Sequence, residues 1–122
     1  MTSGASGRLT THVLDTMHGR PGRGILVELF RLRGEDHEPL LSVRTNEDGR
    51  CDRPLLHGDE LQAGTYEIVF HIGEYFQAEG VSSGAPRFLD LVPVRFGIAS
   101  PDEHYHVPLL VTPYGYSTYR GS

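Results

Sequence analysis

Short segments in which apolar side chains alternate with other residues run through most of this chain. In one of them Tyr66, Ile68 and Phe70 occupy every second position, which is the spacing of side chains on one face of a β-strand. Similar segments cover residues 9–15, 25–32, 40–45, 92–98 and 104–110. We therefore expect about eight strands at roughly 8- to 12-residue spacing, a pattern typical of an antiparallel β-sandwich.

Turn residues separate these segments. Residues 46–49, Asn-Glu-Asp-Gly, are a strong turn signal, and residues 19–22, Gly-Arg-Pro-Gly, divide the first strand from the second. The one helix candidate is short, because residues 73–80 begin and end with glycine. Pro93 predicts that the segment 92–98 is an edge or irregular strand, since proline has no N–H to donate to a neighbouring strand.

Length and charge limit the class of protein. A chain of 122 residues suffices for one domain with a single core, which we expect to span residues 8–122, with residues 1–7 as a disordered tail. The net charge of −5 and the absence of a basic cluster argue against nucleic acid as a partner. We find neither a run long enough to cross a bilayer nor a secretory signal, and therefore expect a cytoplasmic protein without a membrane partner.

The C-terminal region is rich in groups that can bind or react. His104 and His106 lie two positions apart, so both imidazoles leave the same face if this segment is a strand. Three tyrosines and Arg120 follow within residues 114–120. Ordering a chain end costs entropy, and this composition therefore indicates a tail that packs against the domain and contributes to a site.

Two further candidates lie earlier in the chain, and each has an ordinary alternative. His12 shares a strand face with Thr10 and Leu14, where a histidine is often only a structural hydrogen-bonding group. Arg50 directly follows a turn and could be a solvated charge. All eleven basic residues are arginine, which excludes Schiff-base chemistry on a lysine side chain.

A zinc site is an open alternative for the histidines. The His-x-His spacing of His104 and His106 is used by some zinc enzymes, with His12 as a possible third ligand. The pattern is weak without a firm third ligand, and we expect neither a metal nor another cofactor.

Three blocks of sequence together resemble one known family, the 5-hydroxyisourate hydrolases, also called transthyretin-like or transthyretin-related proteins. The blocks are LTTHVLDT at residues 9–16 with Gly19 and Pro21, TNEDGR at 45–50, and HYHVPLL at 104–110 continuing to the final YRGS at 119–122. The closing tetrapeptide is the family's signature, and GEYF at 73–76 matches the start of the family's helix. The likeness covers nearly the whole chain from Leu9.

This resemblance implies a mainly β fold, namely a transthyretin-like antiparallel β-sandwich of two four-stranded sheets with one short helix. It also implies a homotetramer with sites at the dimer–dimer interface. The expected catalytic group is His12, Arg50, His106 and Ser122. Tyr119 is expected to bind substrate together with His12 and Arg50, while supporting roles are expected for His104, Arg120 and Gly121.

The implied reaction is hydrolysis of 5-hydroxyisourate to 2-oxo-4-hydroxy-4-carboxy-5-ureidoimidazoline in urate degradation. Water attack on a ring carbonyl needs a base, a group that stabilises the oxyanion and a proton donor for the leaving nitrogen. His12 and His106 can divide the base and acid roles because imidazole has a pKa of about 6.5. Arg50 offers a planar set of N–H donors to oxygen atoms.

A small-molecule or hormone carrier is the alternative on the same fold, because fold does not determine function. A channel for an apolar hormone would not favour two imidazoles and an arginine, since each buried polar group must be desolvated and paired. The residues therefore favour the enzyme.

Overall fold

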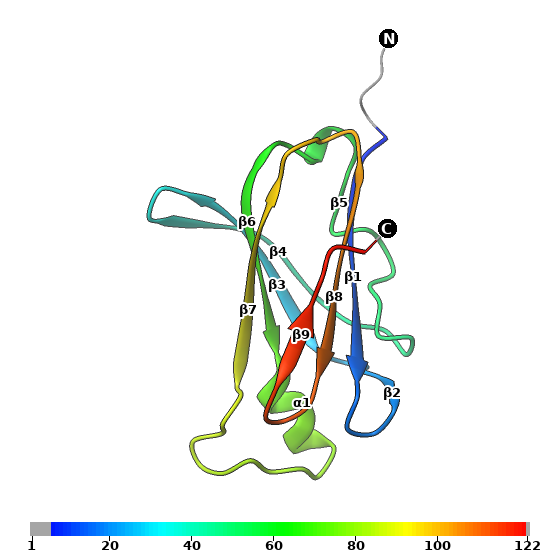
Figure 1. The fold of residues 1–122 in the computed structure, drawn as a ribbon, viewed down its shortest axis with the longest axis vertical. Coiled ribbons are helices and arrows are strands. Elements are labelled where there is room, and N and C mark those ends of the chain that lie inside the picture. Colours follow the sequence, from blue (N-terminus) through cyan, green and yellow to red (C-terminus); the bar gives the residue numbers. More distant parts are fainter. Residues whose placement is uncertain (1–5, 122) are drawn as a thin grey trace.

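The computed structural model describes residues 6–121, and Figure 1 shows their arrangement. The elements in chain order are β1 (Arg8–Asp15), β2 (Arg20–Pro21), β3 (Leu26–Arg33), β4 (Asp36–Arg44), β5 (Leu56–His57), the 3-10 helix η1 (Gly58–Glu60), β6 (Gly64–His71), α1 (Ile72–Ala78), β7 (Leu91–Ile98), β8 (His104–Val111) and β9 (Tyr116–Thr118). No helix in this part of the chain is long and apolar enough to cross a membrane.

The strands form two sheets, as expected for a sandwich. One sheet has the order β4-β3-β6-β7 and is antiparallel throughout. The other has the order β2-β1-β8-β9, with the short β5 paired to β1 as a fifth strand. Pro93 lies in β7, an edge strand, which confirms the prediction from its missing N–H.

The pairing of β1 with β8 differs from the antiparallel arrangement that we expected. These two strands are parallel over their full length, from Arg8 opposite His104 to Asp15 opposite Val111. A hairpin turn makes neighbouring strands antiparallel, but β1 and β8 lie near opposite ends of the chain and share no such turn. Their direction is therefore set by the packing of the whole domain.

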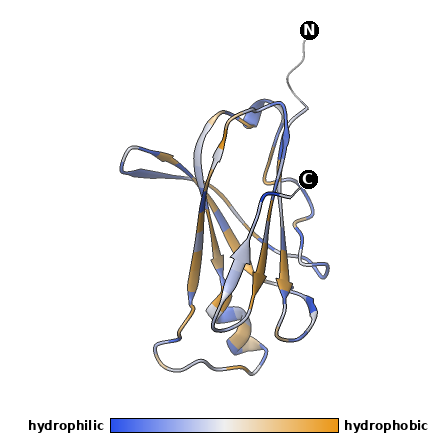
Figure 2. Cartoon of the chain, viewed as in Figure 1, coloured by the Kyte–Doolittle hydropathy of each residue, from blue (hydrophilic) through white to orange (hydrophobic). Residues whose placement is uncertain are grey.

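Burial alternates along both strands of this central pair. In β1 the side chains of Leu9, Thr11 and Val13 point into the core, and in β8 those of Tyr105 and Leu109 do so. On the opposite face of each strand most residues are half-buried, although Pro108 of β8 is buried. Figure 2 shows the hydrophobic residues concentrated along the strands, while the tip of the β3–β4 hairpin is hydrophilic.

The N-terminal end of the described chain is in contact with the domain. Gly7 is buried and its carbonyl accepts a hydrogen bond of 2.9 Å from the N–H of Gly58. Of the tail that we expected to be disordered, residues 1–5 lie outside the described residues. The division into a tail and one domain stays a prediction.

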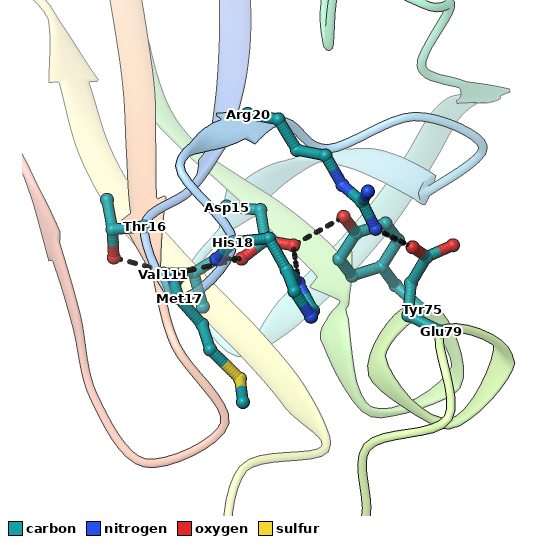
Figure 3. Close-up of polar contacts among 8 residues, drawn as sticks. All are labelled: Asp15, Thr16, Met17, His18, Arg20, Tyr75, Glu79 and Val111. Carbon is teal, nitrogen blue, oxygen red and sulfur yellow. Dashed lines mark hydrogen bonds and ion pairs between the residues drawn. The ribbon is translucent and has the colours of Figure 1, made fainter.

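A buried carboxylate holds the turn after β1 against α1 (Figure 3). One oxygen of Asp15 accepts hydrogen bonds of 3.0 Å from the N–H groups of Met17 and His18, and the other accepts one of 2.6 Å from the Tyr75 hydroxyl. That second oxygen also contacts Nδ1 of His18 at 2.6 Å. Burial raises the pKa of Asp15, but hydrogen bonds from Tyr75 and His18 outweigh it, so the pKa lies below its ordinary value.

We expect Asp15→Asn to lower the free energy of unfolding by about 2–3 kcal/mol at pH 7, because an amide NH₂ would replace an oxygen that accepts two hydrogen bonds. Tyr75→Phe is expected to lower the free energy of unfolding by about 1.5–2 kcal/mol. Since the native pKa is lowered, the stabilisation by the carboxylate is present above the ordinary pKa of 3.8 and is lost as the pH falls through the native pKa.

Urea unfolding of both variants at pH 7 and below pH 4, at fixed protein concentration, measures these effects. Asp59→Asn, at an exposed position in η1, is the control. A loss for Asp15→Asn that is no larger than the loss for Asp59→Asn would contradict a stabilising role for the network.

Candidate active site

The parallel β1–β8 pair places polar residues side by side on its outer face. Its register sets Arg8 opposite His104, Thr10 opposite His106, and His12 opposite Pro108. Thr10, His12, His104 and His106 are each half-buried. The shared face that we expected for His104 and His106, and for Thr10 and His12, is therefore confirmed.

A hollow of about 310 Å³ opens on this face. Within residues 6–121, the side chains that line it include three guanidinium groups and two imidazoles but no Asp or Glu. The lining residues are Arg8, Thr10, Thr11, Arg50, Cys51, Arg53, His104 and His106. A hollow with this lining favours a ligand rich in carbonyl or anionic oxygen atoms.

Arg50 reaches the hollow because the turn before it is attached to β1. The Asn46 side-chain oxygen accepts hydrogen bonds from the N–H groups of Asp48 at 2.9 Å and Arg50 at 3.1 Å. Gly49 has φ of 75° and lies so close to β1 that a Cβ atom there would be 2.4 Å from the Val13 carbonyl oxygen. Glycine therefore allows the contact that brings Arg50 opposite His12 in an antiparallel bridge.

Each imidazole has a defined hydrogen-bond partner. His12 Nε2 lies 2.9 Å from the Asp48 carbonyl oxygen. A carbonyl can only accept, so this nitrogen of His12 carries the proton and Nδ1 is left as the basic atom. His104 Nε2 and His106 Nδ1 both contact the Thr10 hydroxyl, at 2.9 Å and 2.8 Å.

The surroundings keep the imidazoles neutral. Burial lowers the pKa of His106, and the charge of Arg50 lowers it further, with smaller contributions from His104 and His12. Burial and Arg50 also lower the pKa of His12, although the Asp48 carbonyl opposes this. The pKa of His104 is lowered by burial and then by Arg8 and Arg120. A neutral imidazole near pH 7 is available as a base.

The C-terminal segment folds back over β8 beside the histidines (Figure 1). The Gly121 N–H donates a hydrogen bond of 2.7 Å to the His106 carbonyl, and a Cβ atom at this position would lie 2.7 Å from Cδ2 of the His106 ring. Arg120 donates hydrogen bonds to Glu103 at 2.9 Å and to the His104 carbonyl at 3.1 Å. The tail is therefore packed against the strand that carries both histidines.

Other expected site residues lie elsewhere. Tyr119 lines a separate groove that is bordered by β7, β8 and the C-terminal segment, and its side chain is exposed. Ser122 lies outside the described residues. His12 is next to the hollow, through its bridge to Arg50, but does not line it. The structure thus groups Arg50, His104 and His106, with His12 and Gly121 beside them.

Sequence reasoning missed several residues of the hollow. Arg8 and Thr10 could have been found, because they precede His12 by four and two positions on the same strand face. Arg53 and Cys51 follow Arg50 in an irregular segment with no periodic signal. Burial, with a smaller contribution from Asp52, raises the pKa of the Cys51 thiol to about 11, so it remains protonated near neutral pH.

The zinc alternative required a third ligand near His104 and His106. Among residues 6–121, no group of three or more His, Cys, Asp or Glu side chains is placed so that it could hold a metal ion. The two ring nitrogens that face Thr10 are instead engaged by its hydroxyl.

The fold and the outer face of the β1–β8 pair define a transthyretin-like sandwich that carries imidazole and guanidinium groups. A solved structure of sea bream transthyretin in complex with thyroxine has this fold, with a TM-score of 0.83 at 21% identity over 93% of this chain and 94% of that one. A model of the HIUase/Transthyretin family matches residues 9–121. The chain belongs to this family.

Curated relatives extend the similarity over nearly the full chain. A 5-hydroxyisourate hydrolase of Pseudomonas aeruginosa is 58% identical over 95% of this chain and 92% of its own length. A 5-hydroxyisourate hydrolase 2 of Rhizobium meliloti is 60% identical, with coverage of 96% and 98%. A solved structure of (S)-allantoin synthase has a TM-score of 0.93 and 48% identity over all of this chain, which spans 46% of that protein.

We expect Arg50→Gln to raise the pKa of both His106 and His12, because it removes a positive charge that disfavours protonation of each imidazole. Titration of the histidine ring protons by NMR measures the two values. Arg33→Gln, in an exposed ion pair with Glu38, is the matched control. Unchanged pKa values in Arg50→Gln would show that Arg50 does not act on these rings.

Proposed function

We propose that this protein is an enzyme that hydrolyses 5-hydroxyisourate to 2-oxo-4-hydroxy-4-carboxy-5-ureidoimidazoline. The observation that carries the proposal is the hollow that combines His106, His104 and Arg50 with no acidic lining residue in the described chain. The names of relatives at 58% and 60% identity support this activity. The substrate is a flat, oxygen-rich small molecule, which suits a hollow lined by guanidinium groups.

The residues divide the chemistry of ring opening. A neutral imidazole removes a proton from water as the water attacks a ring carbonyl, and His12 and His106 are the candidates for this step. Arg50 stabilises the negative charge on the carbonyl oxygen in the tetrahedral intermediate. An imidazole N–H then donates a proton to the leaving nitrogen.

The active assembly in this proposal is a homotetramer with sites between dimers. The hollow lies on an outer sheet face, so a second subunit that covers it would separate the bound substrate and the attacking water from bulk solvent. Leu109 and Val111 are fully buried in the core, so they do not supply such a contact, while Leu110 is half-buried. The exposed side chains of Tyr114, Tyr116 and Tyr119 are large enough to supply a contact with a second subunit.

A carrier for an apolar hormone is less compatible with this face. The hollow is lined by Arg8, Arg50 and Arg53 as well as two imidazoles, and an apolar ligand would remove water from these groups without pairing them.

A cytoplasmic location also belongs to the proposal that this protein is a 5-hydroxyisourate hydrolase. Acceleration of 5-hydroxyisourate decay, with the substrate generated from urate by urate oxidase, is the direct test.

We expect His12→Ala, His106→Ala and Arg50→Ala each to lose roughly 100-fold or more in turnover, with double variants far from additive because the groups act on one transition state. His104→Ala should lower turnover less than these three substitutions do. Activity should fall as the pH drops through the pKa of the base, which lies below the ordinary imidazole value of 6.5, because the base becomes protonated there.

Ultraviolet decay assays between pH 5 and 8 measure both effects. His57→Ala, at an exposed position in β5, is the control for histidine removal. A flat pH profile would exclude a histidine base, and near-normal turnover of His106→Ala with a large loss in His104→Ala would reverse their roles.

We expect deletion of residues 119–122, or a tag appended after Ser122, to remove most activity with little change in melting temperature. The deletion removes Gly121 from the His106 backbone but leaves β8 and β9 complete, and the lost Arg120–Glu103 pair is exposed and contributes little. Gly121→Ala should act similarly, because its Cβ would displace the His106 ring.

Turnover, size-exclusion elution and thermal unfolding are compared for these variants and for a protein with an N-terminal extension as the control. Full activity and unchanged elution of the truncated protein would show that residues 119–122 do not contribute to the active site.

A further inference from the structure

The Thr10 side chain connects two histidines that are adjacent on β8. Its Oγ1 atom lies 2.9 Å from Nε2 of His104 and 2.8 Å from Nδ1 of His106. The parallel register produces this arrangement, because Thr10 is directly opposite His106 while Arg8 is opposite His104. The two ring centroids are 6.2 Å apart, so the hydroxyl lies in the path between the rings.

One hydroxyl has one proton, and this limits the protonation of both rings. Thr10 can donate to only one of the two nitrogens, so the other must donate to Thr10 for both contacts to be hydrogen bonds. No third hydrogen-bond partner of Thr10 Oγ1 is found within residues 6–121. Because the contacts use Nε2 of His104 and Nδ1 of His106, the two neutral rings must carry their protons on the same type of nitrogen.

We propose that Thr10 is a positioning residue that couples the tautomers of His104 and His106 and carries protons between them. In one state both rings are protonated on Nε2, and in the other both are protonated on Nδ1. The second state leaves Nε2 of His106 unprotonated and able to act as a base. The first presents an N–H at the same atom, which can be donated when a proton reaches Nδ1 through Thr10. The catalytic use of this coupling depends on the hydrolase function proposed above.

After His106 Nε2 takes a proton from the attacking water, the ring is cationic and its Nδ1–H faces Thr10. That proton moves to Thr10 Oγ1 as the original hydroxyl proton moves to Nε2 of His104. His106 becomes neutral with its proton on Nε2, and His104 holds the positive charge. As His106 Nε2 donates its proton to the leaving nitrogen, the extra proton on His104 Nε2 returns through Thr10 to Nδ1 of His106, so both rings end neutral with their protons on Nδ1.

The charged groups around the pair favour a transient rather than a permanent charge. Arg50 and His12 act on His106, while Arg8 and Arg120 act on His104, and all of them disfavour protonation. Arg53 also lines the hollow, and Glu103 is paired with Arg120. A cationic His104 therefore returns its proton readily through Thr10 to His106.

Long-range ¹H–¹⁵N NMR of the histidine rings tests the coupling without substrate. At a pH where both rings are neutral, we expect His104 and His106 to show the same tautomer, or the same ratio of tautomers if they exchange rapidly. Opposite tautomers in the wild-type protein would overturn the proposal. The match should be lost in Thr10→Val and kept in Thr10→Ser, and a match that persists in Thr10→Val would also overturn it.

Kinetics test whether the coupling serves catalysis. We expect Thr10→Val to lower kcat about 10- to 100-fold, the range found for groups that orient another functional group, with little change in KM. Thr10→Ser should restore most of the loss. Thr16→Val is the matched control, because Thr16 donates to Val111 at the far end of the same strand pair and should leave kcat unchanged.

A loss in Thr10→Val that affects only KM, or an equal loss in Thr10→Ser, would overturn the catalytic part of the proposal. If the wild-type protein does not act on 5-hydroxyisourate, the proposed function fails, while the tautomer measurement still decides whether Thr10 couples the rings. Thermal unfolding of each variant separates these effects from a loss of folding.

Discussion

The parallel pairing of β1 with β8 is the constraint on which the rest of this structure depends. Its inward side chains, such as Leu9, Val13 and Leu109, are fully buried, while the outward positions hold Thr10 and His106. A register shift of one residue would exchange the two faces of a strand, exposing the leucines and burying the polar groups. Hydrophobic burial on one face therefore fixes the geometry of the polar site on the other.

Two other segments reach the site by attaching to the backbone of this pair. The turn before Arg50 forms a bridge to His12, and the C-terminal segment forms a bridge from Gly121 to His106. Both approaches depend on glycine, at Gly49 and Gly121, because a side chain would collide with the strand. Burial lowers the pKa values of His106 and His104 most, and the guanidinium groups delivered in this way, Arg50 for His106 and Arg120 for His104, lower them further.

Much of the fold could be predicted because its signals are local. Alternating apolar residues predicted the long strands except residues 36–39 of β4, and the edge position of β7 followed from Pro93. The two-residue strands β2 and β5 are too short to have a periodic pattern. The parallel direction of β1 and β8 was also missed, because no local signal records how two distant segments are oriented.

For the site, the sequence by itself determined the reactive groups and the strand face of each one, since alternation along a strand places Thr10 with His12 and His104 with His106. Only the tertiary structure decided that Thr10 lies between the two histidines of β8, 94 and 96 positions away in the chain. It also placed Arg8 in the hollow and Tyr119 in a separate groove. These contacts depend on the direction and register of strands that pair across the whole domain, and that pairing follows from the burial of the shared core.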